Sequence, residues 1–334
     1  MDHTFLIVCL VVANALVFDF INGFHDAANA ISTIVVSRTL TPFQAVLMAA
    51  AAEFIGYFFF GVAVAKMIGS QVVHIDQITI QLLIATLLGA IIWNLITWYF
   101  GIPTSSSHAL IGGLIGAGMT KAGASIVVWS GVLKIFTFII IAPLLGLFGA
   151  TAVTTLVIWF SRDSNLRKAN RRFRYLQLVS AATYCVGHGT NDAQKTMGII
   201  ALALYTTGYI KTFDIPHWVV ASAYIAIALG TFSGGWRIVK TMGTKITKIR
   251  QMEGFCAESA AAVVLLGTAH FGIPVSTTHV IAGSIMGVGA IENAAKVRWV
   301  TARKIVWAWF LTIPSAAFFA ALSYYLLSHT GIKI

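Results

Sequence analysis

Residues 100–120 read FGIPTSSSHALIGGLIGAGMT, and residues 271–291 read FGIPVSTTHVIAGSIMGVGAI. The two segments align over their whole length without a gap, and they share the Gly-Ile-Pro triplet, hydroxyl residues, the His and later glycines. Two unrelated apolar helices would not match in register at these residue types, so the match indicates an internal duplication. Each copy places a turn and a run of hydroxyls inside a long apolar stretch. Polar groups are costly to bury there, which predicts a site.

The composition is that of an integral membrane protein. Of the 334 residues, 58% are apolar and only 10% are charged, and the mean hydropathy is +0.86. Soluble domains carry roughly 25% charged residues, whereas here apolar runs of about 20 residues, long enough to cross a bilayer core, recur from end to end. The net charge of +11 arises in short loops between these runs, which fits the positive-inside rule and argues against nucleic-acid binding.

The most polar segment divides the chain into two halves. It reads SRDSNLRKANRRFR at 161–174, a basic linker that we expect in the cytoplasm, and it separates transmembrane repeat 1 (1–160) from transmembrane repeat 2 (175–334) of one membrane domain. The first long apolar run of each half is interrupted by polar residues and glycines, at FDFINGFHDAANA (18–30) and CVGHGTNDAQKT (185–196). We expect each run to form a helix that is broken near the middle of the membrane.

The order of the apolar runs predicts an inverted arrangement of the halves. With the basic linker in the cytoplasm, each half crosses the membrane an odd number of times, and both termini lie on the outer face. The expected fold is therefore an all-α polytopic membrane protein with inverted-topology repeats, broken helices and two re-entrant helical hairpins. This architecture is typical of secondary transporters, whose substrate site lies near the midplane between the repeats.

The two Gly-Ile-Pro segments predict an anion site. Gly101 and Gly272 permit a sharp turn, and Pro103 and Pro274 mark a helix start within the membrane. A helix N-terminus carries free N–H donors and a partial positive charge, which suits a small tetrahedral oxyanion. The alternative is that the hydroxyls only cap the turns. The hydroxyl residues expected to line the anion site are Thr104, Ser105, Ser106, Ser107, Ser276, Thr277 and Thr278.

The two polar interruptions predict a cation site. Asp26 and Asp192 are carboxylates deep in apolar segments, where ionisable groups are expensive and functional by default. Carboxylate and amide oxygens suit Na⁺, and an aspartate can equally carry H⁺, so the coupling ion stays open. Capping of a half-helix is the structural alternative for the aspartates. The amide residues expected to join Asp26 and Asp192 are Asn22, Asn29, Asn191 and Gln194.

Five further titratable residues lie in apolar segments and are candidates for gating or proton transfer: Glu53, Glu258, Lys195, His108 and His279. Lys195 stands where Asn29 stands in the first half, and it is expected either to pair with Asp192 or to attract the anion. A solvated position near the cytoplasmic end stays open for Glu258. The two histidines are expected to bond a carbonyl or a hydroxyl, or else to contact the substrate.

Four stretches of the chain resemble the PiT family of inorganic phosphate transporters. GFHDAANAISTIVVSRTLTP (23–42) and GHGTNDAQKTMGII (187–200) are similar to its duplicated signature G-x-N-D-x-A/G-N/Q, and the Gly-Ile-Pro pair is similar to its hairpin tips. His25 stands where Asn is common in the signature, whereas Asn191 is kept. The resemblance implies phosphate held between the hairpin tips, cation symport through the signature residues, and a compact prokaryotic member in the plasma (inner) membrane.

The function expected from these features is uptake of inorganic phosphate by alternating access, coupled to H⁺ or Na⁺. A permease for sulfate or another tetrahedral oxyanion is the alternative on the same scaffold. An anion channel fits less well because fixed intramembrane carboxylates repel anions, and the sequence has no nucleophile–base set or metal cluster typical of an enzyme. We expect phosphate and membrane lipid as partners and no cofactor besides the coupling ion, and homo-oligomerisation stays open.

Overall fold

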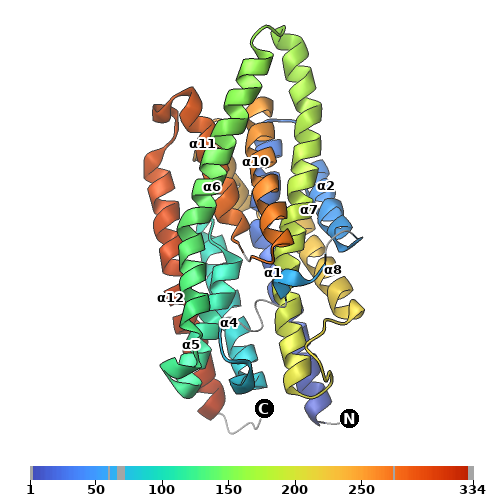
Figure 1. Ribbon diagram of the computed structural model, residues 1–334, viewed down its shortest axis with the longest axis vertical. Helices are drawn as coiled ribbons and strands as arrows, with labels where there is room; N and C mark the ends of the chain where they lie inside the picture. The colour runs from blue at the N-terminus through green and yellow to red at the C-terminus, as the bar shows by residue number, and fades with distance from the viewer. Residues whose placement is uncertain (1–2, 59–60, 66–71, 274, 330–334) are drawn as a thin grey trace.

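The structure is a computed structural model that describes residues 3–58, 61–65, 72–273 and 275–329, so Pro274 lies outside the described residues. The helices are arranged mostly along one long axis (Figure 1). The longer helices are α1 (His3–Val36), α2 (Pro42–Ile55), α4 (Ile80–Phe100), α5 (Ser106–Ala122), α6 (Trp129–Ser161), α7 (Leu166–Thr206), α8 (His217–Ser233), α9 (Trp236–Thr244), α10 (Gln251–His270), α11 (Thr277–Glu292) and α12 (Trp299–His329).

Several of these helices have the length and composition to cross a membrane. In the described part of the chain they are α1, α4, α6, α10 and α12, and a sixth is added if α8 and α9, which meet at a 71° bend, count as one span. The prediction of an all-α polytopic membrane protein is confirmed.

The breaks expected in α1 and α7 are wrong. Both helices run without interruption through 18–30 and 185–196. Glycine and asparagine lower helix propensity by up to about 1 kcal/mol per residue, but neither stretch contains the proline that would remove a backbone donor and clash with the preceding turn. The polar side chains of both stretches therefore project from intact helices.

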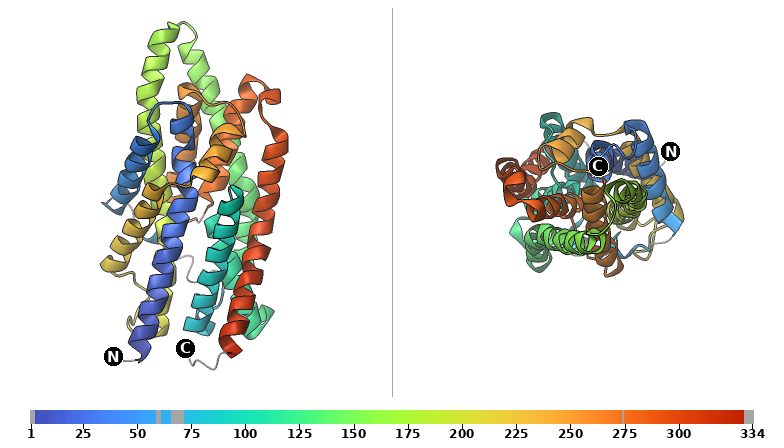
Figure 2. Two further views of the ribbon diagram at one scale, coloured as in Figure 1. Left: turned by 180° about the vertical axis from the view of Figure 1, so that it is seen from behind. Right: turned by 90° about the horizontal axis from the view of Figure 1, so that it is seen from above.

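Gly101 and Gly272 lie at the tips of two helical hairpins, α4–α5 and α10–α11. The hairpins enter from opposite ends of the molecule and their tips meet near its middle (Figures 1 and 2). At each tip the residue that ends the turn, Gly101 or Gly272, has φ of 65°, a left-handed conformation in which a Cβ atom would be strained. The duplicated glycine is thus required by the backbone.

The second helix of each hairpin packs on a long helix of the other half of the chain. A Cβ atom on Gly116 of α5 would lie 2.1 Å from the carbonyl oxygen of Ala317 on α12. A Cβ atom on Gly287 of α11 would lie 2.3 Å from the carbonyl oxygen of Leu147 on α6. Each glycine follows another by four residues, the small-residue spacing that lets membrane helices approach backbone to backbone.

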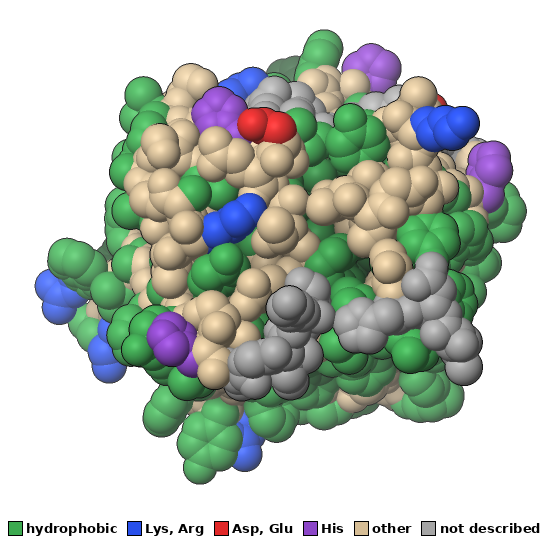
Figure 3. Space-filling view, turned by 90° about the horizontal axis from the view of Figure 1, so that it is seen from below, with side chains coloured by type: hydrophobic (Ala, Val, Ile, Leu, Met, Phe, Trp, Pro, Cys, Tyr) green, Lys and Arg blue, Asp and Glu red, His purple; other side chains and the backbone are tan. Residues whose placement is uncertain are grey.

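The two ends of the molecule differ in charge. The first turn of α1 and the last turn of α12 lie at one end, where the charged side chains of the described residues are isolated from one another (Figures 1 and 3). The opposite end holds the α6–α7 turn, the 245–250 segment and the start of α12 (Figures 1 and 2). Basic residues gather there, and Arg298 binds the carbonyl oxygen of Ile246 through its backbone N–H at 2.9 Å.

Candidate functional site

The site lies where the two hairpin tips meet α1 and α7. The hydroxyl oxygen of Thr278 on α11 lies 3.2 Å from the carbonyl oxygen of Thr104 on the other tip. Lys195 of α7 bridges the tips, since its ammonium donates to the Ser107 hydroxyl and to the carbonyl oxygen of Val275. The predicted anion residues of both halves are therefore brought into one buried cluster.

Two of the predicted hydroxyls act as helix caps. The Ser105 side chain accepts a hydrogen bond from the backbone N–H of His108 at 3.2 Å, and that of Ser276 accepts one from His279 at 3.3 Å. They satisfy one orphan donor each at the start of α5 and α11. The capping alternative therefore holds for these two serines, while the remaining N–H groups of each first helical turn lack an intrahelical partner.

Two other hydroxyls connect the second tip to the carboxylates of both halves. Thr277 donates to Asp192 at 3.2 Å, and Thr278 donates to Asp26 at 3.3 Å. All four side chains are buried. Anion donors and intramembrane carboxylates are thus neighbours, which is the arrangement that a shared anion and cation site requires.

The first tip contributes a different pair of hydroxyls. Thr104 donates to Thr97 of α4 at 3.0 Å, and a ring nitrogen of His25 lies 3.1 Å from the same Thr97 hydroxyl. Ser106 is fully buried, and within the described residues its hydroxyl has no hydrogen-bond partner. A buried hydroxyl normally has a hydrogen-bond partner. The unpaired Ser106 hydroxyl therefore indicates a ligand or a water molecule at this place.

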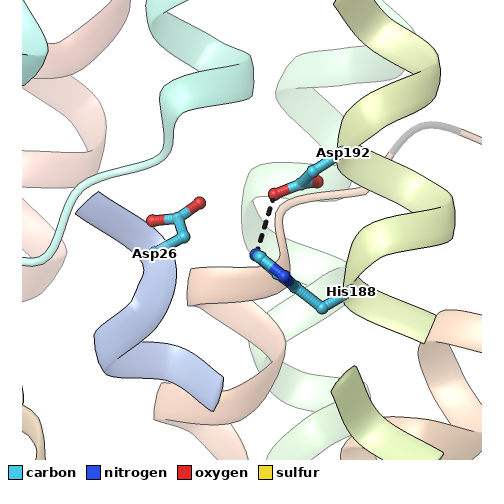
Figure 4. A group of neighbouring side chains, drawn as sticks. All are labelled: Asp26, His188 and Asp192. Atoms are coloured by element: carbon cyan, nitrogen blue, oxygen red, sulfur yellow. Dashed lines mark ion pairs between the residues drawn. The ribbon is translucent and has the colours of Figure 1, made fainter. Parts of the chain in front are cut away.

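The carboxylates of the two halves meet around a histidine. Asp26, His188 and Asp192 each offer a ligand atom, and these atoms lie within 4.8 Å of one another (Figure 4). His188 Nε2 is 3.3 Å from Asp192, and its Nδ1 is 2.7 Å from Glu53 of α2. Neither His188 nor Thr97 was assigned a role from the sequence. The only signal for the histidine was its place one helical turn before Asp192.

The predicted amides fall into two groups. Asn22 and Asn191 are buried, and within the described part of the chain the side-chain oxygen of each lacks a hydrogen-bond partner. The amide of Asn29 donates to Thr278 at 2.9 Å. Asn22 and Asn29 share a helix face with Asp26, so oxygen ligands cluster on that side of α1.

Gln194 stands apart from this cluster. Its side-chain oxygen accepts hydrogen bonds from the backbone N–H groups of Val64 and Ala65, at 2.8 and 3.2 Å. The oxygen that was expected to bind a cation is thus engaged in holding a neighbouring segment. The sequence could not indicate this, because the partner is about 130 residues away along the chain.

Glu258 lies in a separate polar cluster. Its carboxylate accepts hydrogen bonds from Thr33 and Ser180, each at 2.6 Å, and from Gln177 at 3.2 Å. The residue is 0% exposed, so the solvated position that stayed open for it is wrong. Three donors from α1 and α7 stabilise the buried carboxyl group without bringing it into the tip cluster.

The mirrored histidines face each other behind the tips. The ring centroids of His108 and His279 are 4.8 Å apart, and His279 stacks on Trp309 of α12 at 4.0 Å. Among the described residues, neither ring nitrogen of His279 has a hydrogen-bond partner. Stacking on Trp309 is therefore the closest ring contact that the structure shows for His279.

Helix N-termini, hydroxyls and buried carboxylates converge between two opposed hairpins, an arrangement that is typical of secondary transporters in membranes. The model of the phosphate transporter family matches residues 22–320. The chain belongs to this family, and the resemblance of the signature stretches is confirmed.

Similar proteins agree with this assignment. A protein of Rhizobium meliloti (strain 1021) described as "Probable low-affinity inorganic phosphate transporter" is 51% identical, over 97% of this chain and 98% of that protein. One of Bacillus subtilis (strain 168) with the same description is 44% identical over 98% and 99%. A solved structure described as "The sodium-dependent phosphate transporter" has a TM-score of 0.87 at 25% identity, covering 97% of this chain and all of that chain.

These comparisons separate the alternatives that the sequence left open. The family and the relatives indicate inorganic phosphate as the substrate and do not favour sulfate. The family and the apolar helices together identify a multi-pass membrane protein of a phosphate transporter family.

Proposed function

We propose that this protein carries inorganic phosphate across the membrane by symport, with the anion held between the two hairpin tips and a cation held beside it. The observation that carries the proposal is that Thr277 and Thr278 contact Asp192 and Asp26, at 3.2 and 3.3 Å. Anion donors and cation ligands are thus coupled through single hydrogen bonds. Binding of either ion then alters the charge that the other meets.

The same contact favours phosphate over sulfate. At neutral pH phosphate keeps at least one P–O–H group that can donate a hydrogen bond, and sulfate keeps none. The oxygens of Asp26 and Asp192 lie within hydrogen-bond distance of the tip hydroxyls, so acceptors line the proposed cage. A site that hydrogen-bonds a substrate proton rejects an analogue that lacks it.

Na⁺ is the cation that we infer for coupling. Asp26 and the unpartnered side-chain oxygen of Asn22 supply hard oxygen ligands on one face of α1, and the similar solved structure is described as sodium-dependent. H⁺ is the second candidate, because Glu53, His188 and Asp192 form a buried chain of titratable groups with separations of 2.7 and 3.3 Å. Such chains serve as proton relays in membrane transporters.

Alternating access follows from the opposed halves. α1 and α6 run in one direction along the long axis and α7 and α12 in the other (Figure 1), which supports inverted repeats at 1–160 and 175–334. Rocking of these halves around the tips would expose the cage to each side in turn. We assign the basic end with the 161–174 linker to the cytoplasm and both termini to the outer face, in the plasma membrane of a prokaryote.

Reconstitution into liposomes tests this function. Radiolabelled phosphate uptake is measured under an imposed Na⁺ gradient and, separately, under a pH gradient, with unlabelled phosphate or sulfate in excess and with protein-free liposomes as the blank. We expect concentrative uptake under the Na⁺ gradient that unlabelled phosphate blocks and sulfate does not. Uptake that never exceeds equilibrium under either gradient would point to a channel, and block by sulfate would overturn the substrate.

A further inference from the structure

The two halves differ at one position of the site. A shift of 166 residues (192 − 26) superposes Asp26 on Asp192 and Asn29 on Lys195. The neutral amide of Asn29 donates to Thr278 at 2.9 Å. The Lys195 ammonium lies 2.5 Å from Asp192 and also contacts Ser107 and Val275. The second half therefore carries a positive charge where the first half carries none.

The two aspartates differ accordingly in their partners. One oxygen of Asp192 contacts Lys195, and the other accepts from Thr277 and lies 3.3 Å from His188. Asp26 is bonded by Thr278 and by the neighbouring His25. Among the described residues, no lysine or arginine lies within ion-pair distance of Asp26. Asp192 thus has a lysine ammonium as a partner, whereas the partners of Asp26 are a hydroxyl and a histidine ring.

We propose that the Lys195 ammonium is a tethered cation that takes the place of one transported cation, so that the mobile coupling ion binds on the Asp26 side alone. This inference rests on the proposed symport. Lys195 is 1% exposed and reaches residues of both hairpin tips, so its charge acts where the anion is held. A lysine side chain cannot dissociate, and it therefore supplies countercharge without adding to the number of ions moved.

The energetic reason lies in the burial of charge. A fully buried carboxylate without a partner is energetically unfavourable, and a cation with good geometry offsets that cost. At Asp192 this cation is present in every state of the transport cycle. At Asp26 it has to bind and leave in each cycle, and this exchange couples the ion gradient to phosphate movement.

The matched variants are Lys195→Asn, which gives the second half the residue of the first, and Asn29→Lys, which does the reverse. The variants are reconstituted into liposomes whose membrane potential is held at zero with K⁺ and valinomycin. For each imposed Na⁺ gradient, we then measure the phosphate gradient at which net phosphate flux stops. Under an about tenfold Na⁺ gradient, one additional coupled Na⁺ raises the sustained phosphate gradient by about tenfold. We expect this rise for Lys195→Asn and a fall of similar size for Asn29→Lys.

Lys195→Arg is the control that keeps the positive charge. It should show the wild-type ratio of coupled Na⁺ to phosphate. Na⁺ binding is followed independently as the shift in thermal unfolding of the detergent-purified proteins on addition of Na⁺. We expect a larger shift for Lys195→Asn than for wild type, because Na⁺ now fills the vacated position. If Lys195→Asn yields no folded protein, the ratio of coupled Na⁺ to phosphate in Asn29→Lys alone tests the tethered-cation assignment.

Unchanged coupling ratios in the variants, together with an unchanged Na⁺ shift, would overturn the tethered-cation assignment and leave Lys195 as a structural ion-pair partner. That outcome is distinct from failure of the proposed function, in which wild-type protein itself accumulates no phosphate. If a pH gradient and not a Na⁺ gradient drives phosphate uptake by the wild-type protein, the ratio of coupled protons to phosphate is measured in the same way.

Discussion

The two halves of the site share an aspartate, a histidine and an asparagine, but they differ in the order of these residues and at a fourth position. The first half carries, in order along α1, Asn22, His25, Asp26 and Asn29. The second half carries, in order along α7, His188, Asn191, Asp192 and Lys195. Histidine and asparagine have exchanged places, and the last position differs in charge. A duplicated scaffold has thus been turned into two non-equivalent ion environments by a few side chains.

The exchanged histidines reach different parts of the fold. His25 precedes Asp26 directly and lies 3.1 Å from Thr97 of the first hairpin. His188 is one helical turn before Asp192 and lies 2.7 Å from Glu53 of α2. The first half therefore couples its aspartate to a hairpin tip, and the second couples its aspartate to a buried acid. The similarity of the two sequence stretches therefore does not extend to the contacts of their histidines.

The largest expected effect is loss of a carboxylate on either side of the comparison. Asp26→Asn removes the side chain proposed to bind the mobile cation, and Asp192→Asn leaves the Lys195 ammonium without its ion pair. We expect coupled phosphate uptake in liposomes to fall by about 100-fold or more in each case. Asp163→Asn is the control, since that side chain is 88% exposed on the linker. Wild-type uptake by either site variant would refute the assigned roles.

A second comparison concerns the packing of the hairpins. Gly116→Val and Gly287→Val each press a side chain against the backbone of a long helix, where a rotamer change cannot relieve the overlap. We expect each to lower the free energy of unfolding in detergent by about 1–3 kcal/mol or more. Gly267→Ala is the control, because a Cβ atom there meets nothing within 4 Å. Strongly unequal losses would show that the two interfaces are not built alike.

The two buried glutamates provide a milder test. Glu53 contacts His188 beside Asp192, so Glu53→Gln should reduce the initial rate of phosphate uptake by about tenfold, as is usual for groups that orient a ligand side chain. Glu258→Gln should reduce it less, because Thr33, Gln177 and Ser180 connect Glu258 to α1 and α7 and not to the hairpin tips. The reverse order of effects would move the coupling site to the Glu258 cluster.

The smallest expected effect concerns the helix caps. Ser105→Ala and Ser276→Ala each remove a side-chain oxygen that accepts from a backbone N–H at the start of α5 or α11. Each should lower stability by about 1 kcal/mol, seen as a lower midpoint of thermal unfolding. The ratio of cations to phosphate should stay at the wild-type value. A changed ratio in either variant would show that the cap serine also contacts an ion.

The architecture could be predicted from the sequence because helices and turns depend on residues that are close together in the chain. Apolar length indicates the helices, and the Gly-Ile-Pro triplet indicates the two hairpin tips, where Gly101 and Gly272 adopt the same left-handed φ. The expected breaks in α1 and α7 failed because glycine and asparagine weaken a helix without stopping it. A polar stretch within an apolar run therefore does not by itself indicate an interrupted helix.

The chemistry of the site was only partly predictable. The candidate hydroxyls and aspartates are brought together, but their roles remain predictions. Which hydroxyls serve as caps, and which acid meets which histidine, depends on contacts across the chain, such as that between Glu53 and His188, 135 residues apart. Periodicity carries no information about such pairs. The lysine at position 195 was visible in the alignment of the halves, but its contact with both tips was not.

Titration of phosphate into the purified protein, followed by calorimetry at increasing Na⁺ concentrations and at several pH values, tests the central claim most directly. The account predicts that Na⁺ tightens phosphate binding, that phosphate tightens Na⁺ binding by the same factor, and that Asp26→Asn loses this reciprocity. Phosphate binding that is equally tight with and without Na⁺ at every pH would contradict a shared site for the anion and its coupling cation.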